Sequence, residues 1–194
     1  MSDKKFNPEA TILAAAKRCY LADGFAGTGM KEVAERAGIA RSTLYRYFPG
    51  RDDLLVAVIK REMEALNERM RRKQAHYHRP EDIIVEGLIL AIKEIPRRPL
   101  LRAIFASEED SRARRLIWSS DVIVIFGKEL MDHVIRPAQE AGVLQETVRP
   151  EILVEWVYRL LLSFLTLPSN WARSDKQLRT TLHALLIPVL LKQA

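Results

Sequence analysis

Residues 41–46 concentrate side chains that donate hydrogen bonds. Arg41, Ser42, Thr43, Tyr45 and Arg46 fall within six consecutive positions. Arginine N–H groups and hydroxyls bond phosphate oxygens, and one arginine can bond both acceptors on the major-groove edge of a guanine. This run therefore predicts contact with DNA, provided that a single rigid element presents the side chains together.

The residues before this run are those that a tight turn between two short helices requires. Ala34 is small where the helices must approach each other, and Gly38 can adopt a turn conformation that is costly for other residues. Apolar side chains with the spacing to close a small core between the helices are Val33, Ala37, Ile39, Leu44 and Tyr47. With Pro49 stopping the second helix, the pattern predicts a helix-turn-helix with helices at about 28–36 and 40–47.

Residues 28–55 resemble the helix-turn-helix of the TetR family of bacterial transcriptional regulators. The motif Thr-Leu-Tyr-x-Tyr-Phe at 43–48, followed by Arg51, is quite specific to that family, and the resemblance extends over about residues 12–58. The chain departs from the family pattern where a capping Ser or Thr, a serine and a lysine are frequent: at Ala40, Gly50 and Arg51, respectively. Loss of a capping oxygen costs about 1 kcal/mol, which affects individual contacts more than the fold.

The resemblance implies a role for each polar side chain of the motif. Phosphate contacts at the start of the second helix would come from Thr28 and Lys31. The major groove would be faced by Arg41, Ser42, Thr43 and Arg46, and flanking phosphates by Tyr45, Tyr47 and Arg51. The implied function is that of a homodimeric repressor, with double-stranded DNA carrying a palindromic operator as one partner and a small-molecule effector as the other.

The positive charge is confined to the N-terminal part of the chain. The 194 residues contain 31 Lys and Arg against 25 Asp and Glu, a net charge of +6. Residues 1–60 hold 10 basic and 7 acidic residues, residues 61–79 hold 6 and 3, and residues 80–194 hold 15 and 15. Such asymmetry is typical of a polyanion-binding end joined to a neutral remainder. The alternative is a helical protein-interaction adaptor that uses the basic segment for acidic partners.

Nearly every stretch between glycine and proline residues repeats apolar side chains with the helical period, which predicts an all-α fold. A helix at about 8–22 would complete an N-terminal three-helix DNA-binding domain of residues 1–50. The larger C-terminal helical domain would span 51–194, with helices at about 51–75, 81–95, 97–107, 109–141, 150–167 and 174–192. The helix at 109–141 is either continuous or broken near Gly127. We assign the β-branched run at 121–126 to helix, because a single strand would have no partner strand.

Two C-terminal segments predict a homodimer. Residues 152–167 are apolar around nearly the whole helix circumference, so this helix must pack on two sides. Because a monomer could bury only one face of each helix, we expect the helices at about 150–167 and 174–192 to pair with their copies. The resemblance implies the same four-helix bundle, and the alternative is a helix central to its own domain.

The resemblance also implies an effector pocket in the C-terminal domain, for a small and largely apolar ligand. The candidate lining residues are the large side chains of the helical region, Met63, Leu66, Met70, Leu88, Phe105, Trp118, Phe126, Trp156 and Phe164. Asp121 joins them because a carboxylate within an apolar stretch would need a partner or would orient a polar ligand group. The effector would act by shifting the helix that begins near Arg51, which both domains share.

Other classes of function find little support. A single cysteine, Cys19, permits no intramolecular disulfide and points to a reducing compartment. The four histidines, His76, His78, His133 and His183, include no i, i+4 pair, so we expect no metal. No nucleophile or phosphate-binding motif is present, so we expect neither an enzyme nor a cofactor. Without a signal peptide or a membrane span of about 20 apolar residues, the chain is expected to be cytoplasmic.

Overall fold

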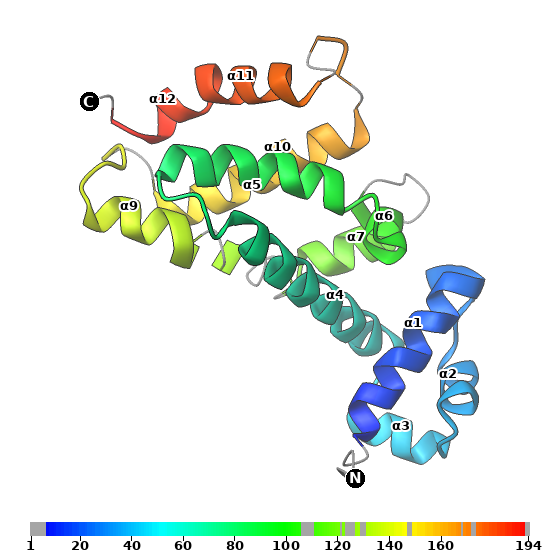
Figure 1. Cartoon of the computed structure of the whole chain (residues 1–194). Coiled ribbons are helices and arrows are strands. Elements are labelled where there is room, and N and C mark those ends of the chain that lie inside the picture. The colour runs from blue at the N-terminus through cyan, green and yellow to red at the C-terminus, as the bar shows by residue number, and fades with distance from the viewer. Residues whose placement is uncertain are drawn as a thin grey trace.

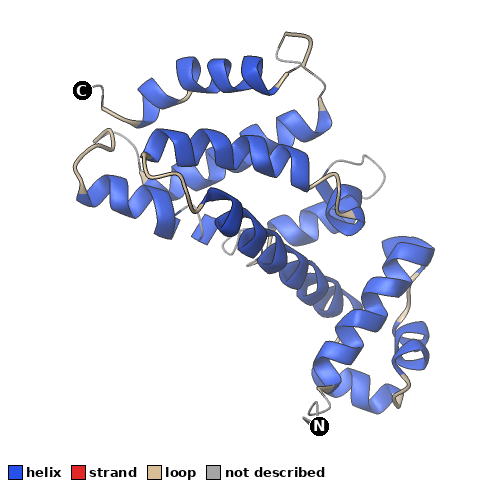
Figure 2. Cartoon of the chain, viewed as in Figure 1, coloured by secondary structure: helices blue, strands red, loops and turns tan. Residues whose placement is uncertain are grey.

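The computed structural model describes residues 7–105, 111–120, 122, 127–128, 131–146, 149–167, 169–171 and 174–192. The regular elements of these residues are helices, and one isolated antiparallel bridge joins Leu144 and Leu191 (Figure 2). The all-α prediction is confirmed. Of the predicted helix at 121–126, only Val122 belongs to the described residues, and it is helical.

Three helices form the N-terminal unit: α1 (Pro8–Gly27), α2 (Met30–Ala37) and α3 (Arg41–Tyr47). The side chain of Asn7 caps α1 by accepting a hydrogen bond from the N–H of Ala10 over 3.1 Å. This cap satisfies one of the N–H groups that a helix start leaves without an intrahelical partner.

Glycine residues form the kink of α1 and the turn after α2. Helix α1 continues beyond its predicted end at residue 22 and kinks at Gly24, where φ is 72°. After α2, Gly38 adopts the left-handed conformation, with φ 67° and ψ 34°. A side chain would strain that backbone, so the sharp turn into α3 depends on glycine. Val33 and Leu44 are buried in the small core, whereas the predicted core residue Tyr47 is 36% exposed.

Helix α4 (Arg51–Gln74) runs from this unit into the remaining helices (Figure 1). One stripe of apolar side chains is buried along it: Leu54, Leu55, Val58, Ile59, Met63 and Leu66. The helix packs against α1 at one end and against α5 at the other. It is therefore the covalent connection between the two ends of the molecule, which also meet where α1 packs against α6.

The C-terminal part is built around α5 (Pro80–Glu94), which packs against α4, α10 and α11. The other elements are α6 (Pro99–Phe105), α7 (Ser111–Trp118), η1 (Met131–Ile135), α9 (Arg136–Glu140), α10 (Pro150–Thr166), α11 (Asp175–Leu185) and α12 (Ile187–Leu190). Figure 1 shows α11 lying along the side of the α5 and α10 pair that faces away from α4.

Two predicted long helices are broken. The one predicted at 109–141 stops after α7, where the hydroxyl of Ser120 donates to the carbonyl of Ile117 over 2.7 Å and accepts from the N–H of Val122 over 3.4 Å. The one predicted at 174–192 breaks at Leu186 into α11 and α12. Pro188 explains that break, because proline has no N–H and its ring clashes with the preceding turn.

No helix of the described residues is long and apolar enough to cross a membrane. Across the same residues, His, Cys, Asp and Glu side chains do not gather in groups of three or more that could hold a metal ion. Cys19 is fully buried in the stripe of α1, and this burial raises the pKa of its thiol.

Candidate functional site

Helix α3 presents a polar outer face held in place by one buried residue. Leu44 is completely buried and anchors the helix to the N-terminal unit. On the opposite side, Arg41, Ser42, Tyr45 and Arg46 are exposed, and we call these four residues the α3 surface. Thr43 is half-buried beside it. The structure thus places on one helix six of the nine side chains that the sequence predicted to contact DNA, Arg41, Ser42, Thr43, Tyr45, Arg46 and Tyr47, whereas Thr28, Lys31 and Arg51 lie outside α3.

An aromatic ring helps to position one arginine of the α3 surface. The guanidinium carbon of Arg46 lies 5.6 Å from the ring centroid of Tyr47. A cation over an aromatic face is attracted by the ring quadrupole, and this attraction restricts the rotamers of both side chains. The partly exposed Tyr47 ring therefore has a positioning role in addition to its predicted phosphate contact.

The two predicted phosphate ligands near the start of α2 differ in exposure. Lys31 is exposed, and its Nζ lies 3.9 Å from Oε1 of Glu35. Such a surface pair contributes less than about 1 kcal/mol, so Lys31 remains available to a phosphate. Thr28 is only 2% exposed, and its hydroxyl donates to the carbonyl of Gly24 over 2.8 Å. Its burial argues against the predicted phosphate contact and assigns Thr28 to the kink of α1.

The first residue of α4 is bound to the end of α1. The guanidinium of Arg51 donates a hydrogen bond to the carbonyl of Phe25. Further along, Nζ of Lys17 lies 2.6 Å from Oε1 of Glu62, which is a second link between α1 and α4. The sequence predicted only a phosphate contact for Arg51. This internal bond joins the first turn of α4 to the N-terminal unit.

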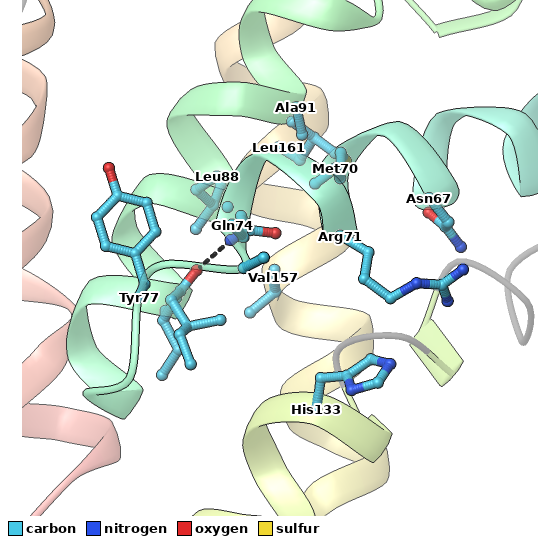
Figure 3. A pocket seen from close by; sticks show the side chains of 14 residues that line it. Asn67, Met70, Arg71, Gln74, Tyr77, Leu88, Ala91, His133, Val157 and Leu161 are labelled. Atoms are coloured by element: carbon cyan, nitrogen blue, oxygen red, sulfur yellow. Dashed lines mark hydrogen bonds between the residues drawn. The ribbon is translucent and has the colours of Figure 1, made fainter.

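A cavity of about 300 Å³ lies where the last turns of α4 meet α5, α10 and η1 (Figure 3). Its lining residues are Asn67, Met70, Arg71, Gln74, Ala75, Tyr77, Ile83, Ile84, Gly87, Leu88, Ala91, His133, Val157 and Leu161. The volume is at the lower end of the range for small-molecule sites, and the lining combines an apolar majority with a few polar groups. We call it the effector cavity, after the role that we propose for it below.

Two of the predicted pocket residues, Met70 and Leu88, line the effector cavity. Three others do not line it and are buried elsewhere in the core: Met63, Leu66 and Phe105. Three more are absent from the lining and at least partly exposed: Trp118, Trp156 and Phe164. Asp121 and Phe126 lie outside the described residues. Residue size therefore selected three core residues and three partly exposed ones, whereas the lining of the cavity depends on where α4 ends.

The wall of the cavity is fixed by polar contacts between α4 and α5. Nε2 of Gln74 donates to the carbonyl of Ile83 over 2.9 Å. Nearby, the buried carboxylate of Glu94 accepts hydrogen bonds from Arg69 and Lys73, each over 2.7 Å. These hydrogen bonds lower the pKa of Glu94 to about 2, so the carboxylate stays charged and holds the two helices together.

Large apolar side chains remain exposed on α10, α11 and α12. They are Ile152 and Trp156 on α10, Leu185 on α11 and Val189 on α12, and we refer to these four residues as the outer apolar face. The opposite side of α10 is buried against the rest of the chain through Leu153, Val157, Tyr158 and Leu161. Exposed apolar patches of this kind mark interaction surfaces.

The sequence is similar to those of known bacterial transcriptional regulators. Residues 12–58 match the model of a family described as bacterial regulatory proteins, tetR family. An HTH-type transcriptional regulator of Mycobacterium tuberculosis is 27% identical over 178 residues, which are 92% of this chain and 83% of that protein. The HTH-type transcriptional repressor KstR of Rhodococcus jostii is 43% identical over 61 residues, 31% of this chain and 26% of KstR.

The fold is also similar to that of solved structures. The regulator FadR of Bacillus subtilis, crystallised in complex with stearoyl-CoA, superposes with a TM-score of 0.59 over 90% of this chain and 94% of FadR. The two sequences are 17% identical, so the similarity concerns the fold.

Proposed function

Because the chain belongs to the TetR family of bacterial regulatory proteins, we propose that it is a homodimeric repressor released from a palindromic operator by a small, largely apolar effector. The family consists of DNA-binding transcriptional regulators and not of enzymes. Membership of the family does not by itself establish that the protein is a dimer, that it represses rather than activates, or that an effector releases it from DNA. We propose these three properties.

One observation carries the proposal: α4 lines the effector cavity and is also bonded to the N-terminal unit that carries the α3 surface. Its last turns supply Asn67, Met70, Arg71 and Gln74 to the effector cavity, while its first residue, Arg51, is bound to α1. A ligand that displaces the cavity end of α4 would therefore move the N-terminal unit. We place the boundary between a DNA-binding domain, residues 1–50, and an effector-binding domain, residues 51–194, at the start of this helix.

For DNA recognition, we propose that Arg41, Ser42, Thr43 and Arg46 face the major groove. Flanking phosphates would be contacted by Lys31, Tyr45, Tyr47 and further N–H groups of Arg51, since a guanidinium has five N–H donors. Two copies would occupy successive major grooves, so the half-site spacing of the operator would equal the spacing of α3 in the dimer.

For the effector, the proposal requires differential binding. A complete reversal of operator occupancy needs about 10⁴-fold tighter binding to the released state. The largely apolar lining of the effector cavity supports an apolar ligand body. The stearoyl-CoA complex of FadR, which shares the fold, supports ligand binding within this helical architecture.

The test begins with the selection of bound fragments from a random DNA library. Operator affinity is then measured by fluorescence anisotropy, with and without a saturating compound that a thermal-shift screen finds to bind the protein. We expect the compound to lower the affinity strongly. Equal affinities in the two titrations would reject release by an effector.

A second measurement separates the proposal from the adaptor alternative. Replacing Arg41 and Arg46 with glutamine should abolish selective operator binding without changing the far-UV circular dichroism. If instead these replacements leave all interactions of the protein intact, the basic segment does not act through DNA. A reporter gene fused to the selected operator shows whether the protein represses or activates transcription. A fall in reporter expression when the regulator is deleted would contradict repression.

A further inference from the structure

One hydrogen bond fixes the orientation of a side-chain amide in the wall of the effector cavity. Gln74 is the last residue of α4, and its Nε2 donates to the carbonyl of Ile83 on α5 over 2.9 Å. A carbonyl oxygen accepts hydrogen bonds and does not donate them, so this contact assigns the nitrogen and the oxygen of the amide. Oε1 therefore takes the other direction, and Figure 3 shows it on the side of Met70 and Val157, away from Tyr77.

The lack of a side chain at Gly87 permits this orientation. A Cβ atom at Gly87 would lie 2.9 Å from Nε2 of Gln74, but 3.8 Å from its Oε1. The amide nitrogen thus lies against α5, and the oxygen lies farther from that helix. Among the described residues, no donor is hydrogen-bonded to Oε1. This oxygen is therefore an acceptor in the cavity wall whose orientation is set by the two helices.

The other polar side chains of the lining are engaged within the fold or directed elsewhere. Asn67, Arg71 and His133 each take part in interactions of the folded chain. The ring of Tyr77 points away from Oε1 of Gln74 (Figure 3) and also lines a second cavity, beside α11. A ligand in the effector cavity can thus bond Oε1 without breaking a contact of the fold.

An acceptor in a largely apolar wall selects the polar group of the ligand. A ligand group that cannot donate would remove water from Oε1 without replacing its hydrogen bond, which costs free energy. A carboxylate contains acceptors only, so it would bring its own lone pairs against Oε1. A cation would add charge to a lining that already contains Arg71, and the 14 lining residues that the structure describes include no Asp or Glu. An uncharged donor satisfies the wall best.

We propose that the effector is an uncharged, largely apolar molecule with one hydroxyl or amide N–H group, which donates a hydrogen bond to Oε1 of Gln74. Gly87 is a positioning residue, because it lets the amide keep this orientation. The inference rests on the proposed function, since it takes this cavity as the effector site. It adds the polar group by which the ligand is recognised, and it places that contact on the last residue of α4.

The test compares two isomeric probes, 1-octanol and 1-methoxyheptane, of which only the alcohol can donate a hydrogen bond. Isothermal titration calorimetry of the full chain gives both dissociation constants, and we call the ratio of ether to alcohol the donor preference. One net hydrogen bond predicts a donor preference about 3- to 10-fold larger in the wild type than in Gln74→Met, which has no amide. Gln139→Met, the same exchange at an exposed position of α9, should leave the donor preference unchanged.

Gly87→Ala tests the orientation of the amide while keeping the amide itself. The new methyl group would meet the end of a flexible side chain, and alanine favours a helix more than glycine does. The variant should therefore fold with an unchanged or higher melting temperature. Because the methyl group displaces Nε2 of Gln74 from Ile83, Oε1 turns with it, and the donor preference should fall toward that of Gln74→Met. A merely structural role of Gly87 would not lower the donor preference at undiminished stability.

The outcomes separate this inference from the proposed function. Equal donor preferences in the wild type and Gln74→Met would overturn the assignment of Oε1, and an unchanged preference in Gly87→Ala would overturn the positioning role. Tighter binding of octanoate than of 1-octanol, or failure of 1-octanol to bind, would overturn the ligand class. Operator affinity is measured separately by anisotropy without probe, so a protein that binds DNA but shows no donor preference contradicts only the inference. A protein without selective DNA binding contradicts the proposed function, whatever its donor preference.

Discussion

A single buried carboxylate, Glu94, joins the connecting helix to the C-terminal helices. It is 3% exposed and pairs with Arg69 and Lys73, which precede it in sequence by 25 and 21 residues. The spacing of residues so far apart in the sequence does not indicate that they pair. A glutamate near the end of a helix is usually predicted to be exposed to solvent. The cluster could therefore be found only in the folded chain.

Glu94→Gln should lower the free energy of unfolding by about 2 kcal/mol at pH 7, because Arg69 and Lys73 lose a charged partner. The folded-state pKa of Glu94 is about 2, below its ordinary value of 4.5. The carboxylate thus stabilises the fold above pH 4.5, and this contribution disappears as the pH falls toward 2. Urea unfolding at pH 7, 4 and 3 should show the difference between wild type and variant shrinking with acid. A difference that is constant over this range would show that Glu94 does not titrate as its contacts require.

The polar residues of the two candidate sites differ in how well the sequence predicts them. The α3 surface was predictable, because outward positions follow from a short helix whose inward position is Leu44. In the effector cavity, Arg71 and His133 were missed, since polar side chains on amphipathic helices are usually solvated. Thr28 was assigned to phosphate although its hydroxyl bonds Gly24, a local contact that residue type alone does not reveal.

At the scale of elements, helices with a clear apolar stripe were predicted within a few residues. Helix α4 was expected at about 51–75 and extends over Arg51–Gln74. The breaks after α7 and α11 were missed because the apolar stripe continues through each break. Each break is caused by a single local residue. The hydroxyl of Ser120 bonds the backbone after α7, and Pro188 interrupts the last helical stretch after α11.

Gly127 permits a close approach between two C-terminal elements. A Cβ atom at this position would lie 2.3 Å from Cγ1 of Val154 on α10. Gly127→Ala should therefore destabilise the protein by about 1–3 kcal/mol, because a β-branched neighbour cannot move its methyl group away. Thermal unfolding of the single variant and of Gly127→Ala with Val154→Ala tests the contact. If the double variant recovers none of the lost stability, the cost does not arise at Val154.

At the scale of the whole molecule, the outer apolar face is the surface on which the proposed dimer depends. Trp156→Glu, which places a charge in that face, should shift sedimentation equilibrium toward the monomer and weaken operator binding, since two recognition helices must bind together. Leu21→Glu on α1 is the matched control, because both parent residues are 47% exposed. If wild type and both variants sediment with the same mass, this face is not the dimer interface.

The positive charge of the molecule is not equally available to DNA along its length. In residues 61–79, Arg69 and Lys73 are paired with Glu94, and Arg72 is paired with Glu68. Arg79 is paired with Glu81, so most of the basic side chains of this segment already face a carboxylate within the fold. The salt dependence of operator binding should therefore depend on the N-terminal unit. If about six phosphates are neutralised per dimer, log affinity falls against log salt with a slope near −5.

Lys31→Gln should make this slope about two units shallower, because each protomer loses one phosphate contact. Arg72→Gln should leave it unchanged, although both replacements remove one positive charge per chain. Anisotropy titrations at five salt concentrations measure both slopes. Equal changes for the two variants would mean that net charge, and not its place on the fold, governs binding. A change for Lys31→Gln alone assigns the phosphate contacts to the helix-turn-helix, because the two variants differ only in where the charge was removed.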